Sequence, residues 1–129
     1  MSYANVGIGI DLVAIPRIQR LLERWGDRFL RRIYTPGEIG YCLDHPVPAQ
    51  ALAARFAAKE AFFKALATRQ VPGITHRAIE VTITERGFPA IKVHGAARDA
   101  LGDRKALLSI SHDGDFAVAM VLVYAEVES

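Results

Sequence analysis

Residues 55–64 read RFAAKEAFFK, and the rest of the chain is organised around this stretch. It lies in a run of helix-forming residues that begins at Pro48 and continues to about Thr68 without an internal glycine or proline. Proline suits a first helical position because its ring fixes φ and no N–H is needed there. The pattern therefore predicts one long helix over this run.

Glu60 lies on a mostly apolar face of the predicted helix. At about 100° per residue it shares that face with Phe56 and Phe63, and Lys64 follows one turn later. A carboxylate that is buried there without a partner is costly. An ordinary Glu60–Lys64 pair at i, i+4 would satisfy it, and so would a bound cation.

Composition limits the possible classes of protein. The 129 residues, 51% of them hydrophobic, are enough for the core of one domain, which we assign to residues 1–129. The single cysteine, Cys42, permits no intrachain disulfide and indicates a reducing cytoplasm. We see no signal peptide, and the longest apolar run, residues 116–125, is too short to span a bilayer.

An alternating segment near the N-terminus predicts a strand. We expect its apolar side chains to pack inward, while glycines on the other face let a helix or a ligand approach closely. Asp11 stands at the end of that second face, either as a helix-entry cap or as a site residue, and the two roles are compatible. The inward set is Val6, Ile8, Ile10 and Leu12, and the other set is Gly7, Gly9 and Asp11.

A basic helix is predicted next, from Pro16 to Trp25, with Gly26 as its stop and Asp27 as the cap of a further short helix. Its predicted core face consists of Ile18, Leu21, Leu22 and Trp25. Three arginines, Arg17, Arg20 and Arg24, project within an arc of about 60°. A solvated basic face is the ordinary explanation, and a docking surface for an acidic partner is the alternative.

The remaining patterns complete an α+β fold. Thr35-Pro36-Gly37-Glu38 is a capping box that opens a short helix to about Cys42. Residues 78–84 and 90–93 form a predicted hairpin, residues 95–101 a helix, and residues 107–111 and 116–124 a second hairpin. The last strand is apolar on both faces, so we expect it to be central or covered by a partner subunit. Together these elements predict an antiparallel-dominated sheet with one long helix packed on it.

Three motifs in order along the chain resemble the holo-acyl-carrier-protein synthases, bacterial 4′-phosphopantetheinyl transferases. They are Gly9, Asp11 and Arg17, then Phe56, Ala57, Lys59, Glu60, Ala61 and Lys64, then Ser109, Ser111 and His112. Lesser matches are Thr35, Pro36 and Glu38, and Gly87 and Pro89 followed by Gly95. The chain departs from the family at Ala67 and Arg69, where the family usually has glycine.

The resemblance implies a 4′-phosphopantetheinyl transferase-like fold and transfer of phosphopantetheine from coenzyme A to a serine of an acyl carrier protein, with release of 3′,5′-ADP. Asp11 and Glu60 would hold Mg²⁺, and Lys64 would neutralise charge on the departing phosphate. An adjacent carboxylate or a metal-held water would take the serine proton. The resemblance further implies a role in fatty acid biosynthesis and a homotrimer with active sites between subunits.

Coenzyme A contacts and carrier docking follow from the same resemblance. For Lys59, a solvated lysine is an equal alternative, and His45, His76 and His94 receive no role. The implied coenzyme A contacts are Arg55, Lys59, Lys64, Thr68, Pro89, Ser111 and His112. The resemblance places carrier docking on the helix after Asp11 and matches Arg17, while Arg20 and Arg24 join it as docking residues from the helical geometry alone.

Two other classes of protein compete with this hypothesis. A non-enzymatic adaptor would use the arginines to bind an acidic protein, with Asp11 as a cap and Glu60 without a cation. A nucleic-acid binder is disfavoured by the net charge of only +2 and by the lack of a basic and aromatic platform.

Overall fold

The computed structural model describes residues 2–67 and 73–127 and shows the predicted α+β architecture. In chain order its elements are β1 (Ser2–Ala14), α1 (Ile15–Trp25), α2 (Asp27–Ile33), α3 (Pro36–Leu43), α4 (Pro48–Leu66), the 3₁₀ helix η1 (His76–Ala78), β2 (Ile79–Ile83), β3 (Pro89–Val93), α5 (Gly95–Leu101), β4 (Lys105–Asp113) and β5 (Phe116–Val127). Thr68, which we expected to end α4, lies outside the described residues.

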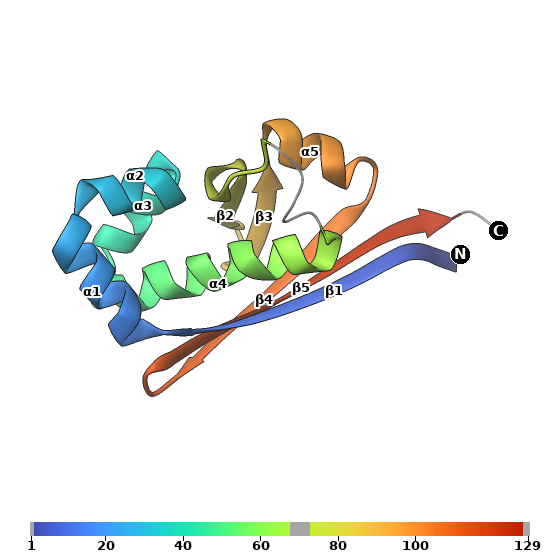
Figure 1. Ribbon diagram of the computed structural model, residues 1–129. Coiled ribbons are helices and arrows are strands. Elements are labelled where there is room, and N and C mark those ends of the chain that lie inside the picture. The colour runs from blue at the N-terminus through green and yellow to red at the C-terminus, as the bar shows by residue number, and fades with distance from the viewer. Residues whose placement is uncertain (1, 68–72, 128–129) are drawn as a thin grey trace.

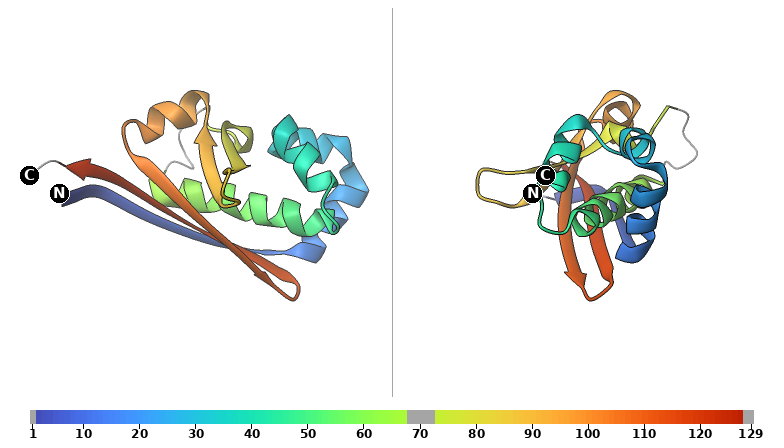
Figure 2. Two further views of the ribbon diagram at one scale, coloured as in Figure 1. Left: turned by 180° about the vertical axis from the view of Figure 1, so that it is seen from behind. Right: turned by 90° about the vertical axis from the view of Figure 1, so that its left-hand side faces the viewer.

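Helix α4 lies along a three-stranded antiparallel sheet of order β1-β5-β4, as Figure 1 shows. Of the two alternatives for β5, a central position or cover by a partner subunit, the central position is confirmed. The antiparallel hairpin β2–β3 contacts α4 through β2 and the sheet strand β4 through β3, and helix α5 lies against η1. Helices α1, α2 and α3 gather around the N-terminal end of α4 (Figure 2). None of the helices in the described ranges is long and apolar enough to cross a membrane.

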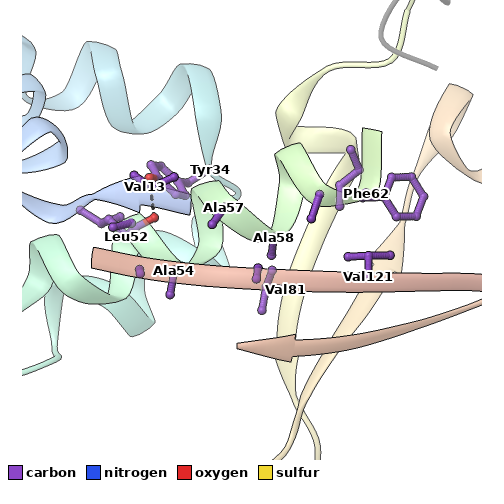
Figure 3. Packing of buried hydrophobic residues seen from close by; sticks show 14 of the residues in the cluster. Val13, Tyr34, Leu52, Ala54, Ala57, Ala58, Phe62, Val81 and Val121 are labelled. Atoms are coloured by element: carbon purple, nitrogen blue, oxygen red, sulfur yellow. Dashed lines mark hydrogen bonds between the residues drawn. The ribbon is translucent and has the colours of Figure 1, made fainter. Parts of the chain in front are cut away.

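The core surrounds α4 on several sides. Phe62 and Val121 face each other between helix and sheet, and Val81 of β2 lies near Ala58 (Figure 3). The Tyr34 hydroxyl donates to the carbonyl of Leu52 at 2.8 Å, which ties the entry of α3 to α4. Alanines on α4 leave room for these neighbours, so a helix without a single apolar stripe can be buried almost all round.

Strand β1 meets α4 at the level of the backbone. A Cβ at Gly9 would overlap the carbonyl oxygen of Ala61, and one at Gly7 would overlap that of Ala65. Only glycine permits this approach, because every other residue has a Cβ atom. The predicted close approach of a helix to the glycine face is therefore confirmed.

The expectation that the apolar face of β1 packs inward is wrong. Ile8 is 64% exposed and Ile10 58% exposed, while Gly9 is buried. Alternation shows which residues share a face but not which face meets the core. Helix α4 can pack closely only on the face of β1 that carries the glycines. The outward face continues onto the neighbouring strands at Leu107 and Met120, so the sheet presents an open apolar surface.

Three details of the basic helices also differ from the expectation. Trp25 is 43% exposed rather than in the core, with the guanidinium carbons of Arg24 and Arg28 at 5.1 and 5.4 Å from its ring centre. Asp11 does not cap α1, whose N-cap is Ala14. Asp27 is the first residue of α2 after the N-cap Gly26 and makes no capping hydrogen bond. By contrast, the capping box of Thr35 and Glu38 is present as predicted.

Candidate active site

The glycine contact places Asp11 beside the C-terminal half of α4. Lys64 Nζ lies 3.1 Å from Asp11 Oδ1 and donates to the Ile10 carbonyl at 2.9 Å. The Asp11 side chain is 17% exposed and that of Lys64 47% exposed. Among the described contacts Lys64 therefore pairs across to β1, and the Glu60–Lys64 pair, one of the two alternatives left open by the sequence, is not formed.

Glu60 points toward η1 instead. Its Oε2 lies 2.9 Å from Nε2 of His76, and its side chain is 14% exposed. The His76 ring stacks on Phe56 with ring centres 5.5 Å apart and meets the edge of Phe63 at 5.2 Å. Arg17 of α1 covers Phe56 with its guanidinium carbon 5.8 Å from the ring centre. Side chains of β1, α1 and η1 thus contact the same side of α4, the side that carries Phe56, Glu60 and Lys64.

Two carboxylates and one ammonium group are suited to binding a cation and a phosphate together. The Asp11 carboxylate already pairs with the ammonium group of Lys64, so positive charge is stabilised beside it. No set of three or more His, Cys, Asp or Glu side chains within residues 2–67 and 73–127 could hold a metal alone. Mg²⁺ keeps several waters and takes one or two carboxylates plus substrate phosphates, so Asp11 and Glu60 fit its donor preference.

Lys59 does not fit either of its two expected roles. Its side chain is fully buried, and Nζ donates to Glu38 Oε1 at 2.7 Å, to the His76 carbonyl at 2.9 Å and to the Ile79 carbonyl at 2.5 Å. Burial lowers the pKa of Lys59, and the Glu38 carboxylate opposes that shift. An ammonium group has three donors, so none is left for coenzyme A. The expectation of a solvated lysine is wrong, and the implied contact of Lys59 with coenzyme A does not fit these three bonds.

Arg55 and His112 lie toward the N-terminal half of α4. Arg55 is 6% exposed, its guanidinium carbon lies 4.3 Å from the ring centre of Tyr41, and its Nη1 donates to the Ala51 carbonyl. Its buried Nε has no hydrogen-bond partner among the described residues. His112 Nδ1 lies 3.3 Å from the side-chain nitrogen of Gln50.

Ser111 and Pro89 are not brought to Asp11 and Lys64 within one chain. Ser111 pairs with Val118, which pairs with Leu12, so Ser111 lies on the open face of the sheet. Asp11 lies on the opposite face, toward α4. Pro89 begins β3 and borders a groove along residues 106–110 of β4. The implied site residues therefore fall into separate groups on a single chain.

The end of α4 keeps a backbone shape that favours glycine. Ala67 caps the helix with φ +53°, in the left-handed region, although it carries a Cβ. That conformation costs about 1 kcal/mol or more for a residue other than glycine. The departure at Ala67 therefore leaves the helix end in this left-handed turn, while Thr68 and Arg69 lie outside the described residues.

His76 is the residue that sequence reasoning missed. It follows Glu60 by 16 positions and stands after a loop, so no helical or strand spacing links the two side chains. The only available signal was its place just before the predicted strand that begins at residue 78. That signal does not indicate which helix face the ring meets.

The chain is similar to known proteins over most of its length. A model of the 4′-phosphopantetheinyl transferase superfamily matches residues 7–121. The holo-[acyl-carrier-protein] synthase of Koribacter versatilis is 46% identical over 121 residues, covering 92% of this chain and 97% of that protein. The Helicobacter pylori synthase in complex with coenzyme A superposes with a TM-score of 0.80 at 34% identity, covering 90% of this chain and 98% of that one.

A further solved structure is the Bacillus anthracis holo-(acyl-carrier-protein) synthase in complex with CoA (3′,5′-ADP). It has a TM-score of 0.77 at 34% identity and covers 93% of this chain and 96% of that one. The family model, the relatives and the fold agree with one another, and they confirm the resemblance that the three motifs indicated. The chain belongs to the holo-[acyl-carrier-protein] synthases of the 4′-phosphopantetheinyl transferase superfamily.

Proposed function

We propose that this enzyme transfers 4′-phosphopantetheine from coenzyme A to a serine of an acyl carrier protein and releases 3′,5′-ADP in a Mg²⁺-dependent reaction. The observation that carries the proposal is the placement of Asp11 against Lys64, with Glu60 on the same helix one turn before that lysine. Support for the substrates comes from relatives solved with coenzyme A and from one solved with CoA (3′,5′-ADP).

The reaction is an attack by the serine oxygen on the β-phosphorus of the coenzyme A pyrophosphate. A new P–O bond forms, the bond to the bridging oxygen breaks, and 3′,5′-ADP leaves with that oxygen. Such transfers need positioning and neutralisation of charge more than covalent help. A bound Mg²⁺ would supply charge neutralisation at the pyrophosphate. The serine proton would pass to an adjacent carboxylate or to a metal-held water.

Asp11, Glu60 and Lys64 share this work. The two carboxylates would hold the metal, since both supply oxygen donors and both are largely buried at 17% and 14% exposure. Lys64 has the most exposed side chain of the three, and its Nζ contacts the Asp11 carboxylate at 3.1 Å. Its long side chain can turn toward a phosphate, where its charge would stabilise the leaving group.

We further propose a homotrimer with active sites between subunits. The open face of the sheet exposes Ile8, Ile10, Leu107 and Met120, and an apolar patch of this kind marks an interaction surface. A neighbouring copy seated on that face would also meet Ser111, which points away from Asp11 of its own chain. This arrangement supports coenzyme A contacts at Arg55, Pro89, Ser111 and His112 that are drawn from two subunits.

Removal of charge from the site should stop transfer without unfolding the protein. We expect Asp11→Asn and Glu60→Gln to lower turnover by about 100-fold or more, because each removes a charged ligand while keeping its shape.

Lys64→Met should lower kcat more than coenzyme A affinity, since its charge acts mainly on the leaving group. Mass spectrometry of an apo acyl carrier protein, incubated with coenzyme A over a Mg²⁺ series, measures the transfer.

Asp103→Asn, at an exposed turn, serves as the matched control and should behave like the wild type. A near-normal rate of Asp11→Asn or Glu60→Gln at low Mg²⁺ would remove that residue from the metal site. If the wild type transfers nothing to any carrier protein but still binds one, the adaptor hypothesis replaces the enzymatic one.

Carrier docking should depend on Arg17, Arg20 and Arg24, which are exposed on α1. Reversal of all three to glutamate should raise KM for the carrier about tenfold at low salt, because exposed charge pairs contribute up to about 1 kcal/mol each. The loss should shrink at high ionic strength, where screening already weakens the wild type. Coenzyme A binding should change little. The measurement is steady-state kinetics at two salt concentrations.

Lys92→Glu, Arg98→Glu and Lys105→Glu together make the same change in net charge on other elements, and this control should keep the wild-type KM. An unchanged carrier KM in the α1 triple variant would mean that the arginines form only a solvated face. Docking would then use another surface.

The trimer should depend on the open apolar face. We expect the wild type to sediment as three chains and Ile10→Asp to sediment as one, because a charge there opposes burial between copies. Circular dichroism should show an unchanged fold, since Ile10 lies outside the core of its own chain. Leu43→Asp on α3 is the control at a similarly exposed position. A wild type that sediments as a monomer contradicts the proposed assembly.

A further inference from the structure

The ring of His76 is held in a defined orientation between α4 and η1. Phe56 stacks on it with an interplanar angle of 16°, and Phe63 meets it edge-on at 85°. The backbone of the same residue is anchored too, because its carbonyl accepts a hydrogen bond from the buried Nζ of Lys59 at 2.9 Å. Both the ring and the main chain of His76 are thereby fixed before any ligand binds.

The fixed ring presents one nitrogen to Glu60. Nε2 lies 2.9 Å from Oε2 of that carboxylate. An ionised carboxylate only accepts hydrogen bonds, so with Glu60 ionised the donor in this contact is the ring N–H on Nε2. The side chain of His76 is 31% exposed and that of Glu60 14% exposed, so the carboxylate end of this contact is the better shielded from water.

We propose that His76 is a positioning residue that orients the Glu60 carboxylate for a divalent cation. This inference rests on the proposed function, in which Glu60 is a metal ligand. A carboxylate that is already oriented loses less side-chain entropy when the metal binds. Hydrogen bonds of this kind to ligating groups are typically worth a factor of 10–100 in metal affinity.

The inference also gives Lys59 an indirect part in the site. Its Nζ links Glu38 of α3, the His76 carbonyl and the Ile79 carbonyl, so it holds η1 against α4. The motif lysine therefore acts on Glu60 through His76 and does not contact the substrate. The order of contacts runs from Lys59 to the backbone of His76, and from its ring to Glu60.

Two substitutions at His76 separate orientation from packing. His76→Phe keeps an aromatic ring between Phe56 and Phe63 but deletes the donor. His76→Gln deletes the ring but keeps an amide N–H near the position of Nε2. His94→Phe is the matched control, because His94 Nε2 makes a similar contact of 3.0 Å to a glutamate that we do not place in the site, Glu80.

The readout is Mg²⁺ affinity, measured by calorimetric titration in the presence of coenzyme A, with melting temperature beside it. We expect His76→Phe to weaken Mg²⁺ binding about tenfold and to melt close to the wild type. His76→Gln should stay within about threefold of the wild-type affinity, and His94→Phe should match it. A wild-type Mg²⁺ affinity in His76→Phe overturns the inference, as does an equal loss in both His76 variants together with a lower melting temperature.

A measurement on the unmodified protein covers the case in which a variant fails to fold. Nitrogen NMR of the histidine rings should show the proton of His76 on Nε2, and its signal should shift when Mg²⁺ and coenzyme A are added. A ring with its proton only on Nδ1 overturns the inference. If the wild type binds no Mg²⁺ with coenzyme A, the proposed function itself fails, and this outcome differs from a variant that matches a Mg²⁺-binding wild type.

Discussion

The backbone contact between β1 and α4 is the constraint on which the site depends. Gly7 and Gly9 have no Cβ, so the strand can lie directly on the carbonyls of Ala65 and Ala61. The same approach carries Asp11, two residues further along the strand, to within 3.1 Å of Lys64. Any side chain at Gly9 must push strand and helix apart. The fold thus couples the packing of its core to the distance between the charged groups of its site.

A buried ion pair holds the second half of the site. Lys59 and Glu38 are both fully buried, and Glu38 also accepts from the backbone N–H groups of Thr35 and Val81. Every polar atom of the pair is therefore engaged in joining α3, α4, η1 and β2. Loss of one member would strand a buried charge, which typically costs 3–5 kcal/mol. The pair explains why the motif contains a lysine that the proposed reaction does not use.

Much of this arrangement follows from the sequence. The run without glycine or proline predicted α4 correctly, the capping box located α3, and alternation with an Asp-Gly turn located β4 and β5. Alternation could not tell which face of β1 is buried, because the deciding factor is the alanine-rich helix that seats on Gly7 and Gly9. Helical spacing likewise suggested Glu60 as the partner of Lys64, whereas the sheet brings Asp11 closer. His76 reaches Glu60 only through tertiary packing, which spacing does not describe.

The stability of a single alanine variant tests the central claim most directly. Gly9→Ala should lower the free energy of unfolding by about 1–3 kcal/mol or more, since the added methyl group overlaps the Ala61 carbonyl. Gly40→Ala in α3, where a Cβ meets nothing within 4 Å, is the matched control and should be neutral or stabilising by up to about 1 kcal/mol. Chemical denaturation of both variants measures this difference. Equal stability of Gly9→Ala and the wild type would contradict the account, because β1 could then not lie directly on α4.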